Sequence, residues 1–154
     1  MSVISAIESL EDEIYNDGIG IVDAHFSPTK KAACLHKEGV YKGIILDISK
    51  IESHKEWRAL LVEEYSHYDS GALYFLESTI NMPNGRSNRI YCEAKAKRHK
   101  IEKYLPFEHI QKAVDDGCRS DYELSEVLGW PLPFVLEAIA HYERKGLKLN
   151  FKED

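Results

Sequence analysis

Apolar side chains recur at helical spacing at the start of the chain and then gather in short β-branched runs. In residues 3–15 they fall on one face of a helix, and residues 16–18 supply its stop signal. The periodic positions are Ile4, Ile7, Leu10 and Ile14. Residues 19–22 and 43–48 are short and apolar. They predict two strands of a small sheet, with residues 72–76 as a further candidate strand.

A longer helix is predicted over residues 54–68. Ser53 and Glu56 have the spacing of a capping box, in which two side chains satisfy backbone N–H groups at the start of a helix. Apolar and aromatic residues then fall near one side, and residues 69–71 end the helix. The segment 30–39 remains ambiguous between a strand and a loop.

Helical segments dominate the C-terminal part of the chain. Residues 78–88 have the composition of a loop. Residues 89–105 are rich in residues that favour helices and predict a helix, which Pro106 ends. Three short helices should follow, ended by Gly117, Gly129 and Gly146. We therefore expect an α+β fold: a small β-sheet with the helix over residues 54–68, followed by a helical C-terminal part. Residues 1–105 would form one domain and residues 106–154 a three-helix tail that looks like a helix-turn-helix unit.

The charge of the chain argues against nucleic acid as a partner. The 154 residues carry a formal net charge of −6, whereas proteins that bind phosphates are usually basic. The tail over residues 106–154 has six Lys or Arg and ten Asp or Glu, a net charge of −4. Duplex binding through this tail is therefore disfavoured, and a role in packing or in recognising a protein is favoured.

Cysteine usage and hydropathy indicate a cytoplasmic protein. Cys34, Cys92 and Cys118 are odd in number and widely spaced, so they predict reduced thiols and no disulfide framework. Residues 1–15 do not resemble a leader peptide, because acidic residues interrupt them. No apolar run approaches the length that crosses a bilayer, so we expect no membrane association.

One pentapeptide of the helix over residues 54–68 could bind a metal ion. In Glu63-Glu64-Tyr65-Ser66-His67, the first and last residues are four apart and share a helix face. Zinc peptidases use the same spacing in HExxH, where the glutamate after the first ligand acts as general base. Here a glutamate stands at the first ligand position, and carboxylates can also bind zinc. The alternative is a solvated acidic face with one ordinary histidine. The other histidines lack metal-ligand spacing and are interpreted as surface or packing residues.

The sequence around this pentapeptide resembles the ImmA/IrrE-type metallopeptidases of phages and integrative elements. Residues 60–68 look like the active-site helix of that family, in which some members carry EELGHY where others carry HExxH. The preceding strand, the downstream helix with the pattern E-x-K/R-A-R…K-L-I-P, and the C-terminal helices of the family also have counterparts. These are residues 42–47, residues 93–97 with 104–106, and residues 120–126 with 135–146. The resemblance covers roughly residues 5–146.

The resemblance implies a zinc-dependent, site-specific endopeptidase. It implies that Zn²⁺ is held by Glu63, by His67 and by a carboxylate from the downstream helix, with Glu64 as the general base. The implied substrate is a cognate transcriptional repressor of the helix-turn-helix class, whose cleavage switches on a prophage or mobile element.

The third metal ligand has several candidates. Glu93 is the best candidate by its place in the downstream motif, whereas Lys95 stands near the position that the commoner family pattern gives to its acidic ligand. Asp69 and Glu102 are alternative carboxylates. Without a metal, Glu93 would be a surface residue paired with Lys97 one helical turn away.

Two other classes of function stay open. A non-catalytic anti-repressor on the same fold would bind the repressor without cutting it, and a glutamate in place of the first histidine is what a decayed site would contain. A DNA-binding regulator that acts through residues 106–146 is the third candidate, and its acidic charge disfavours it. Metal content separates the first two classes, and salt-dependent binding to duplex DNA would support the third.

Overall fold

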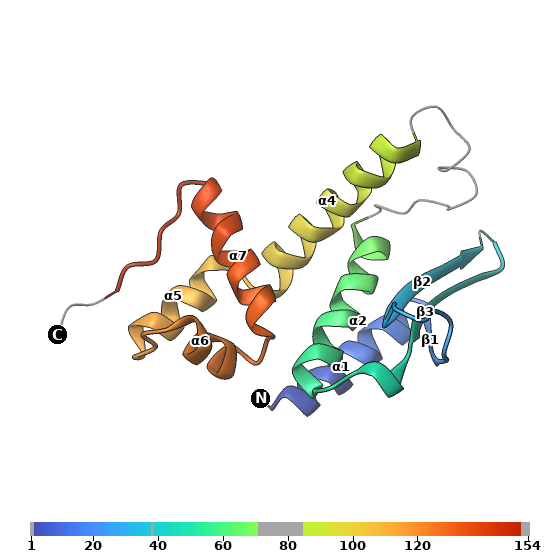
Figure 1. Ribbon diagram of the computed structural model, residues 1–154, viewed down its shortest axis with the longest axis horizontal. Coiled ribbons are helices and arrows are strands. Elements are labelled where there is room, and N and C mark those ends of the chain that lie inside the picture. The colour runs from blue at the N-terminus through green and yellow to red at the C-terminus, as the bar shows by residue number, and fades with distance from the viewer. Residues whose placement is uncertain (1, 38, 71–84, 152–154) are drawn as a thin grey trace. The chain divides into compact units, whose positions relative to one another are not determined.

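The computed structural model describes residues 2–37, 39–70 and 85–151, with side chains described from residue 90 onward after the second gap. The chain divides into two compact units, residues 1–99 and residues 100–154, and helix α4 (Gly85–Tyr104) contributes to both. Six α-helices and a three-stranded sheet make up these residues, so the α+β prediction is confirmed (Figure 1). In the described part of the chain, no helix is both long and apolar enough to cross a membrane.

Helix α1 (Val3–Asn16) forms where the apolar spacing predicts it. The hydroxyl of Ser2 caps its start by accepting the backbone N–H of Ser5 at 3.1 Å. The periodic apolar residues Ile7, Leu10 and Ile14 are buried. Gly18 then adopts a φ of +78°, a left-handed conformation that favours glycine and turns the chain into the first strand.

The sheet contains three strands in the order β1-β3-β2: β1 (Gly20–Asp23), β2 (Ala32–Lys37) and β3 (Tyr41–Leu46). β1 is parallel to β3, and β2 is antiparallel to it. The strands expected at 19–22 and 43–48 are thus present. The ambiguous segment 30–39 contains the edge strand β2, whose sequence AACLHK has little strand character and which forms through its pairing with β3. The candidate strand at 72–76 lies outside the described residues.

Helix α2 (His54–Asp69) packs on α1 and on the sheet (Figure 1). The hydroxyl of Ser53 caps it by accepting the N–H of Glu56 at 3.1 Å, as the capping-box spacing predicts. Leu61, Val62 and Tyr65 are buried in the core of this unit. The Tyr65 hydroxyl lies within hydrogen-bonding distance of carboxylates of Glu13 and Asp17 at the end of α1, which ties the two helices together.

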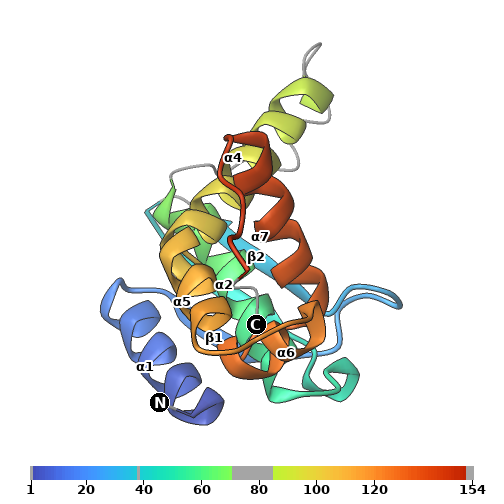
Figure 2. The same cartoon turned by 90° about the vertical axis from the view of Figure 1, so that its left-hand side faces the viewer.

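The second unit is helical, as expected for the tail. It comprises the end of α4 and three short helices, α5 (Phe107–Asp115), α6 (Asp121–Leu128) and α7 (Leu132–Arg144), which Figure 2 shows gathered together. Gly129 ends α6 with a φ of +72°. Trp130 and Phe134 meet edge to face, with ring centroids 4.9 Å apart, in the core of this unit. The Tyr142 hydroxyl donates to the carbonyl of Leu105 at 2.8 Å and so joins α7 to the end of α4.

Candidate metal centre

The second half of α2 lies against strand β2, and the spacing of the strand matches that of the helix. Cys34 and His36 are two residues apart on β2, about 6.6 Å. Glu64 and Tyr68 are four residues apart on α2, about 6 Å. The Cys34 Sγ lies 3.0 Å from the Glu64 Oε2, and the His36 and Tyr68 rings meet edge to face at 5.9 Å. The face of α2 that carries Glu64 and Tyr68 therefore packs against β2.

The Tyr68 hydroxyl anchors this face to the hairpin of β2 and β3. It accepts the backbone N–H of Gly43 at 3.2 Å. Its hydrogen can go to the carbonyl of Leu35 at 2.5 Å or to that of Gly43 at 2.8 Å. Tyr68 therefore serves as a structural link between the helix and both strands.

His67 faces α4, one helical turn from Glu64. Its side chain is buried, and its Nε2 lies 3.6 Å from the Oε2 of Glu93, whose side chain is half exposed. Two donor atoms that each lie about 2.1 Å from a tetrahedral zinc ion are about 3.4 Å apart. The separation of His67 and Glu93 therefore suits two ligands of one zinc ion.

The other two carboxylates considered as third ligands are engaged elsewhere. The Asp69 Oδ2 pairs with the Nε2 of His99 at 2.8 Å. The Glu102 carboxylate pairs with His141 at 3.1 Å and with Lys145, inside the helical unit. Among the three candidates for a downstream ligand, Glu93 is the one brought to His67.

The first ligand expected from the pentapeptide is not gathered with this pair. Glu63 lies on the exposed side of α2. Within residues 2–37, 39–70 and 85–151, no group of three His, Cys, Asp or Glu side chains is placed so that it could hold a metal ion. The residues thus fit zinc through His67 and Glu93, and a third donor is not in place beside them.

Glu64 sits in an environment that disfavours its charged form. Burial raises the pKa of this carboxyl, and the neighbouring Glu63 and Glu93 raise it further, whereas the hydrogen bond from Cys34 and the charge of His67 lower it. A cation at this place would favour the carboxylate form, because it would offset the surrounding negative charge. Elevated pKa values of this kind are common among catalytic acids and bases.

Cys34 is a member of this cluster that the sequence alone does not identify. Burial first, and then the charge of Glu64, raise the pKa of its thiol, so that it stays protonated at neutral pH. The sulfur also lies 3.1 Å from the carbonyl oxygen of Glu64. The sequence contains no sign of this contact, because it depends on β2 lying alongside α2.

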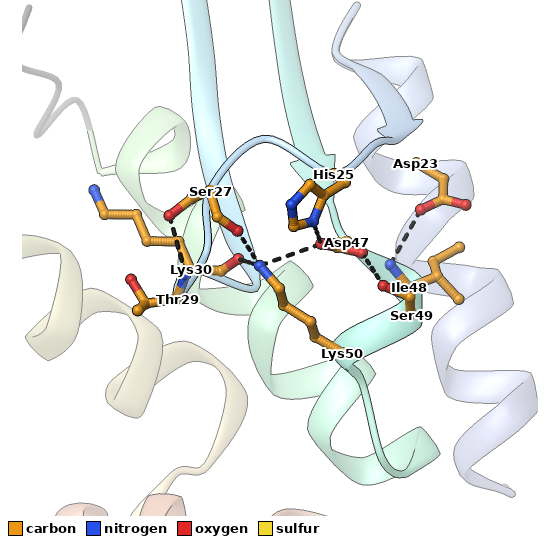
Figure 3. Close-up of polar contacts among 9 residues, drawn as sticks. All are labelled: Asp23, His25, Ser27, Thr29, Lys30, Asp47, Ile48, Ser49 and Lys50. Carbon is orange, nitrogen blue, oxygen red and sulfur yellow. Dashed lines mark hydrogen bonds and ion pairs between the residues drawn. The ribbon is translucent and has the colours of Figure 1, made fainter.

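A second polar cluster surrounds Asp47, directly after β3 (Figure 3). The carboxylate of Asp47 is buried and meets the Nδ1 of His25 at 2.8 Å, the hydroxyl of Ser49 at 2.5 Å and the Nζ of Lys50 at 3.3 Å. Lys50 also donates to the carbonyls of Ser27 and Lys30, the latter at 3.1 Å. These bonds lower the pKa of Asp47 to about 2, that of Ser49 contributing most.

The position of Asp47 in the sheet explains this cluster. Residues 24–31 must pass from β1 over the end of the central strand β3 to reach β2 on the other edge. Asp47 and Lys50 lie at that crossing and hold the loop in place through their bonds to His25 and to the carbonyl of Ser27 (Figure 3). The Asp23 carboxylate also accepts a hydrogen bond from the backbone N–H of Ile48 at 3.1 Å. We therefore assign the cluster a structural role, which sequence analysis missed because the pairing of β1 with β3 was not predicted.

Comparison of the chain with protein-family models, with curated proteins and with solved structures finds no match. The assignment of function therefore depends on the motifs in the sequence and on the geometry around His67.

Proposed function

We propose that this protein is a zinc-dependent, site-specific endopeptidase that cleaves a cognate transcriptional repressor of a prophage or mobile element. The observation that carries the proposal is the approach of His67 on α2 to Glu93 on α4, at 3.6 Å. The two residues are 26 positions apart in the sequence; the family resemblance implies His67 as a ligand, and Glu93 is the best candidate for the third one. Their separation suits zinc.

In this proposal each residue has one task. His67 and Glu93 hold the metal ion, and Glu63 completes the set once its side chain turns toward them. Bound Zn²⁺ supplies Lewis acidity toward a peptide carbonyl and lowers the pKa of water. Glu64 takes a proton from the attacking water and passes it to the leaving amine, so that a C–O bond forms as the C–N bond breaks. Its raised pKa supports this role, because such a carboxyl is better matched to proton transfer near neutral pH.

The proposal for the substrate rests on the family resemblance. The resemblance implies a cognate transcriptional repressor as substrate, and a repressor of the helix-turn-helix class is therefore the proposed substrate here. The negative net charge of −6 supports a protein substrate over nucleic acid.

The test combines metal content with cleavage. The purified protein is mixed with the repressor encoded in the neighbouring reading frame, and the length of the repressor is followed on a gel. We expect one defined cut that a chelator prevents and that added Zn²⁺ restores. Circular dichroism should show that the chelated protein stays folded, because apolar residues supply its core. An intact repressor in the presence of zinc-loaded protein would refute the endopeptidase.

A non-catalytic anti-repressor is the second candidate, and one observation favours it. Glu63 is exposed, and the described residues contain no group of three metal donors. Such a protein would bind the repressor and relieve repression while leaving it intact. Repressor binding with a nanomolar to micromolar Kd, together with zinc below one equivalent and no cleavage, would identify it.

A further inference from the structure

The contact between Cys34 and Glu64 goes beyond the roles assigned so far. The Cys34 Sγ lies 3.0 Å from the Glu64 Oε2 and 3.1 Å from the Glu64 carbonyl oxygen. The thiol has one hydrogen to donate, and both acceptors belong to the same residue. Strand β2 thus makes a polar side-chain contact with α2 at the residue proposed as the general base.

The fold itself holds Cys34 in this place. Cys34 pairs with Ile44 of the central strand β3, and directly opposed residues of an antiparallel pair share a face of the sheet. Ile44 is fully buried. Tyr68, one turn after Glu64, bonds to backbone groups of Leu35 and Gly43 and so fixes the level of the helix along the strand. Neither partner of the Cys34–Glu64 contact can slide without breaking these bonds.

The chemistry of the site makes this thiol a donor. Burial and the charge of Glu64 raise the pKa of Cys34, which favours the protonated thiol that can donate to the 3.0 Å contact with Oε2. The Glu64 carboxylate has two oxygens, and an oxygen that accepts the thiol hydrogen cannot turn away freely. The other oxygen, Oε1, is then the one that exchanges a proton with water.

We propose that Cys34 is a positioning residue, which orients the Glu64 carboxylate for proton transfer by donating its thiol hydrogen to Oε2. The inference rests on the proposed endopeptidase function. General bases must be held within hydrogen-bonding reach of the proton that they take, and a carboxylate that rotates spends less time in that arrangement. Cys34 touches neither the metal nor the substrate in this scheme, and it acts through Glu64.

Two substitutions separate the donor from the volume of the side chain. Cys34→Ser keeps a hydrogen-bond donor, whereas Cys34→Ala removes it and leaves nearly the same backbone preference. We expect kcat for repressor cleavage to fall about tenfold in Cys34→Ala, with KM and the Kd for Zn²⁺ alone unchanged within about twofold. Cys34→Ser should keep kcat within about threefold of the parent. Cys118→Ala, in the other unit, is the matched control and should cleave as the parent does.

Three results would overturn the proposal. They are a kcat of Cys34→Ala equal to that of the parent, a serine variant as slow as the alanine variant, and a change confined to KM. The melting temperature of each variant shows whether it is folded under the conditions of the assay. Among folded variants, a lower kcat in Cys34→Ala than in Cys34→Ser then reports the loss of the hydrogen-bond donor and not a loss of fold.

A spectroscopic measurement tests the contact even if the parent cleaves nothing. In a Cys92→Ser, Cys118→Ser background, the infrared S–H stretching band reports Cys34 alone. Replacing the carboxylate by a neutral amide in Glu64→Gln should weaken the hydrogen bond and move the band to higher frequency. A band that does not move would refute the positioning contact. Absent cleavage with a band that moves would refute the endopeptidase and leave the contact standing.

Discussion

His67 and Glu93 approach each other across two helices, with their Nε2 and Oε2 atoms 3.6 Å apart. His67 is buried on α2 and Glu93 is half exposed on α4, so one partner is fixed by packing and the other can adjust. A buried imidazole with a half-exposed carboxylate 3.6 Å away supplies two donor atoms at a separation that suits one zinc ion.

We predict that His67→Ala removes zinc binding. His67 is the nitrogen ligand of the proposed set, and even outer-shell partners of metal ligands contribute about 10–100-fold to affinity. The Kd for Zn²⁺ should therefore rise by at least about 100-fold, as measured by calorimetric titration. His54→Ala, at the exposed start of the same helix, is the control and should bind as the parent does. Equal zinc content in both variants after dialysis would argue against the site.

We predict that Glu64→Gln keeps zinc and repressor binding but loses cleavage. Glutamine has the size of glutamate and cannot take up a proton as a carboxylate does. General bases contribute about 10²–10⁴-fold to rates, so single-turnover cleavage should slow by at least about 100-fold. Glu8→Gln, on the exposed side of α1, is the matched control. A Glu64→Gln variant that cuts as fast as the parent would show that Glu64 is not the base.

Asp47 should make the protein sensitive to acid. Its pKa is lowered from 3.8 to about 2 by bonds from Ser49, His25 and Lys50, so the folded protein favours the carboxylate. The resulting stability is fully present above about pH 5, and it is lost as the pH falls through 3.8 toward 2.

Urea unfolding of the parent and of Asp47→Asn tests this prediction. The free energy of unfolding of the variant should be lower than that of the parent at pH 6. The difference should shrink by pH 3, because the Asp47 carboxyl of the unfolded parent is then largely protonated while that of the folded parent is still largely charged. Asp12→Asn, an exposed position on α1, should show no such dependence. A difference that stays constant from pH 6 to pH 3 would contradict the assignment.

The core of the first unit should depend on Ile14 and not on Ile4. Both belong to the apolar series of α1, but Ile14 is fully buried and Ile4 is 52% exposed. Replacing a buried isoleucine by alanine costs about 2–5 kcal/mol, from lost burial and the cavity left behind. Ile14→Ala should lower the free energy of unfolding by that amount, and Ile4→Ala should change it by less than about 0.5 kcal/mol. Equal losses would show that the helix is packed on a different face.

Local signals in the sequence were sufficient for the presence of the helices, but the start of α4 was wrong: the helix begins at Gly85, inside the segment 78–88 that was expected to be a loop. Apolar spacing predicts α1 and α2, and Ser53 and Ser120 cap α2 and α6 as their spacing with Glu56 and Glu123 indicates. These signals work because a helix closes its hydrogen bonds within four residues. The same reasoning places Glu64 and His67 on one helix, and the resemblance makes Glu93 the best of several candidates for the third ligand.

Only the tertiary structure determined the sheet and the surroundings of the site. Strand β2 has little strand character of its own, and it forms because β3 offers it a hydrogen-bonding edge. The partners of Cys34 and His25 are Glu64 and Asp47, 30 and 22 residues away. Such contacts arise when separate elements pack and the loop over β3 closes, and no residue pattern within one element encodes them. The sequence therefore determined which segments become helices and which residues are candidates for chemistry, and packing determined which of these residues meet.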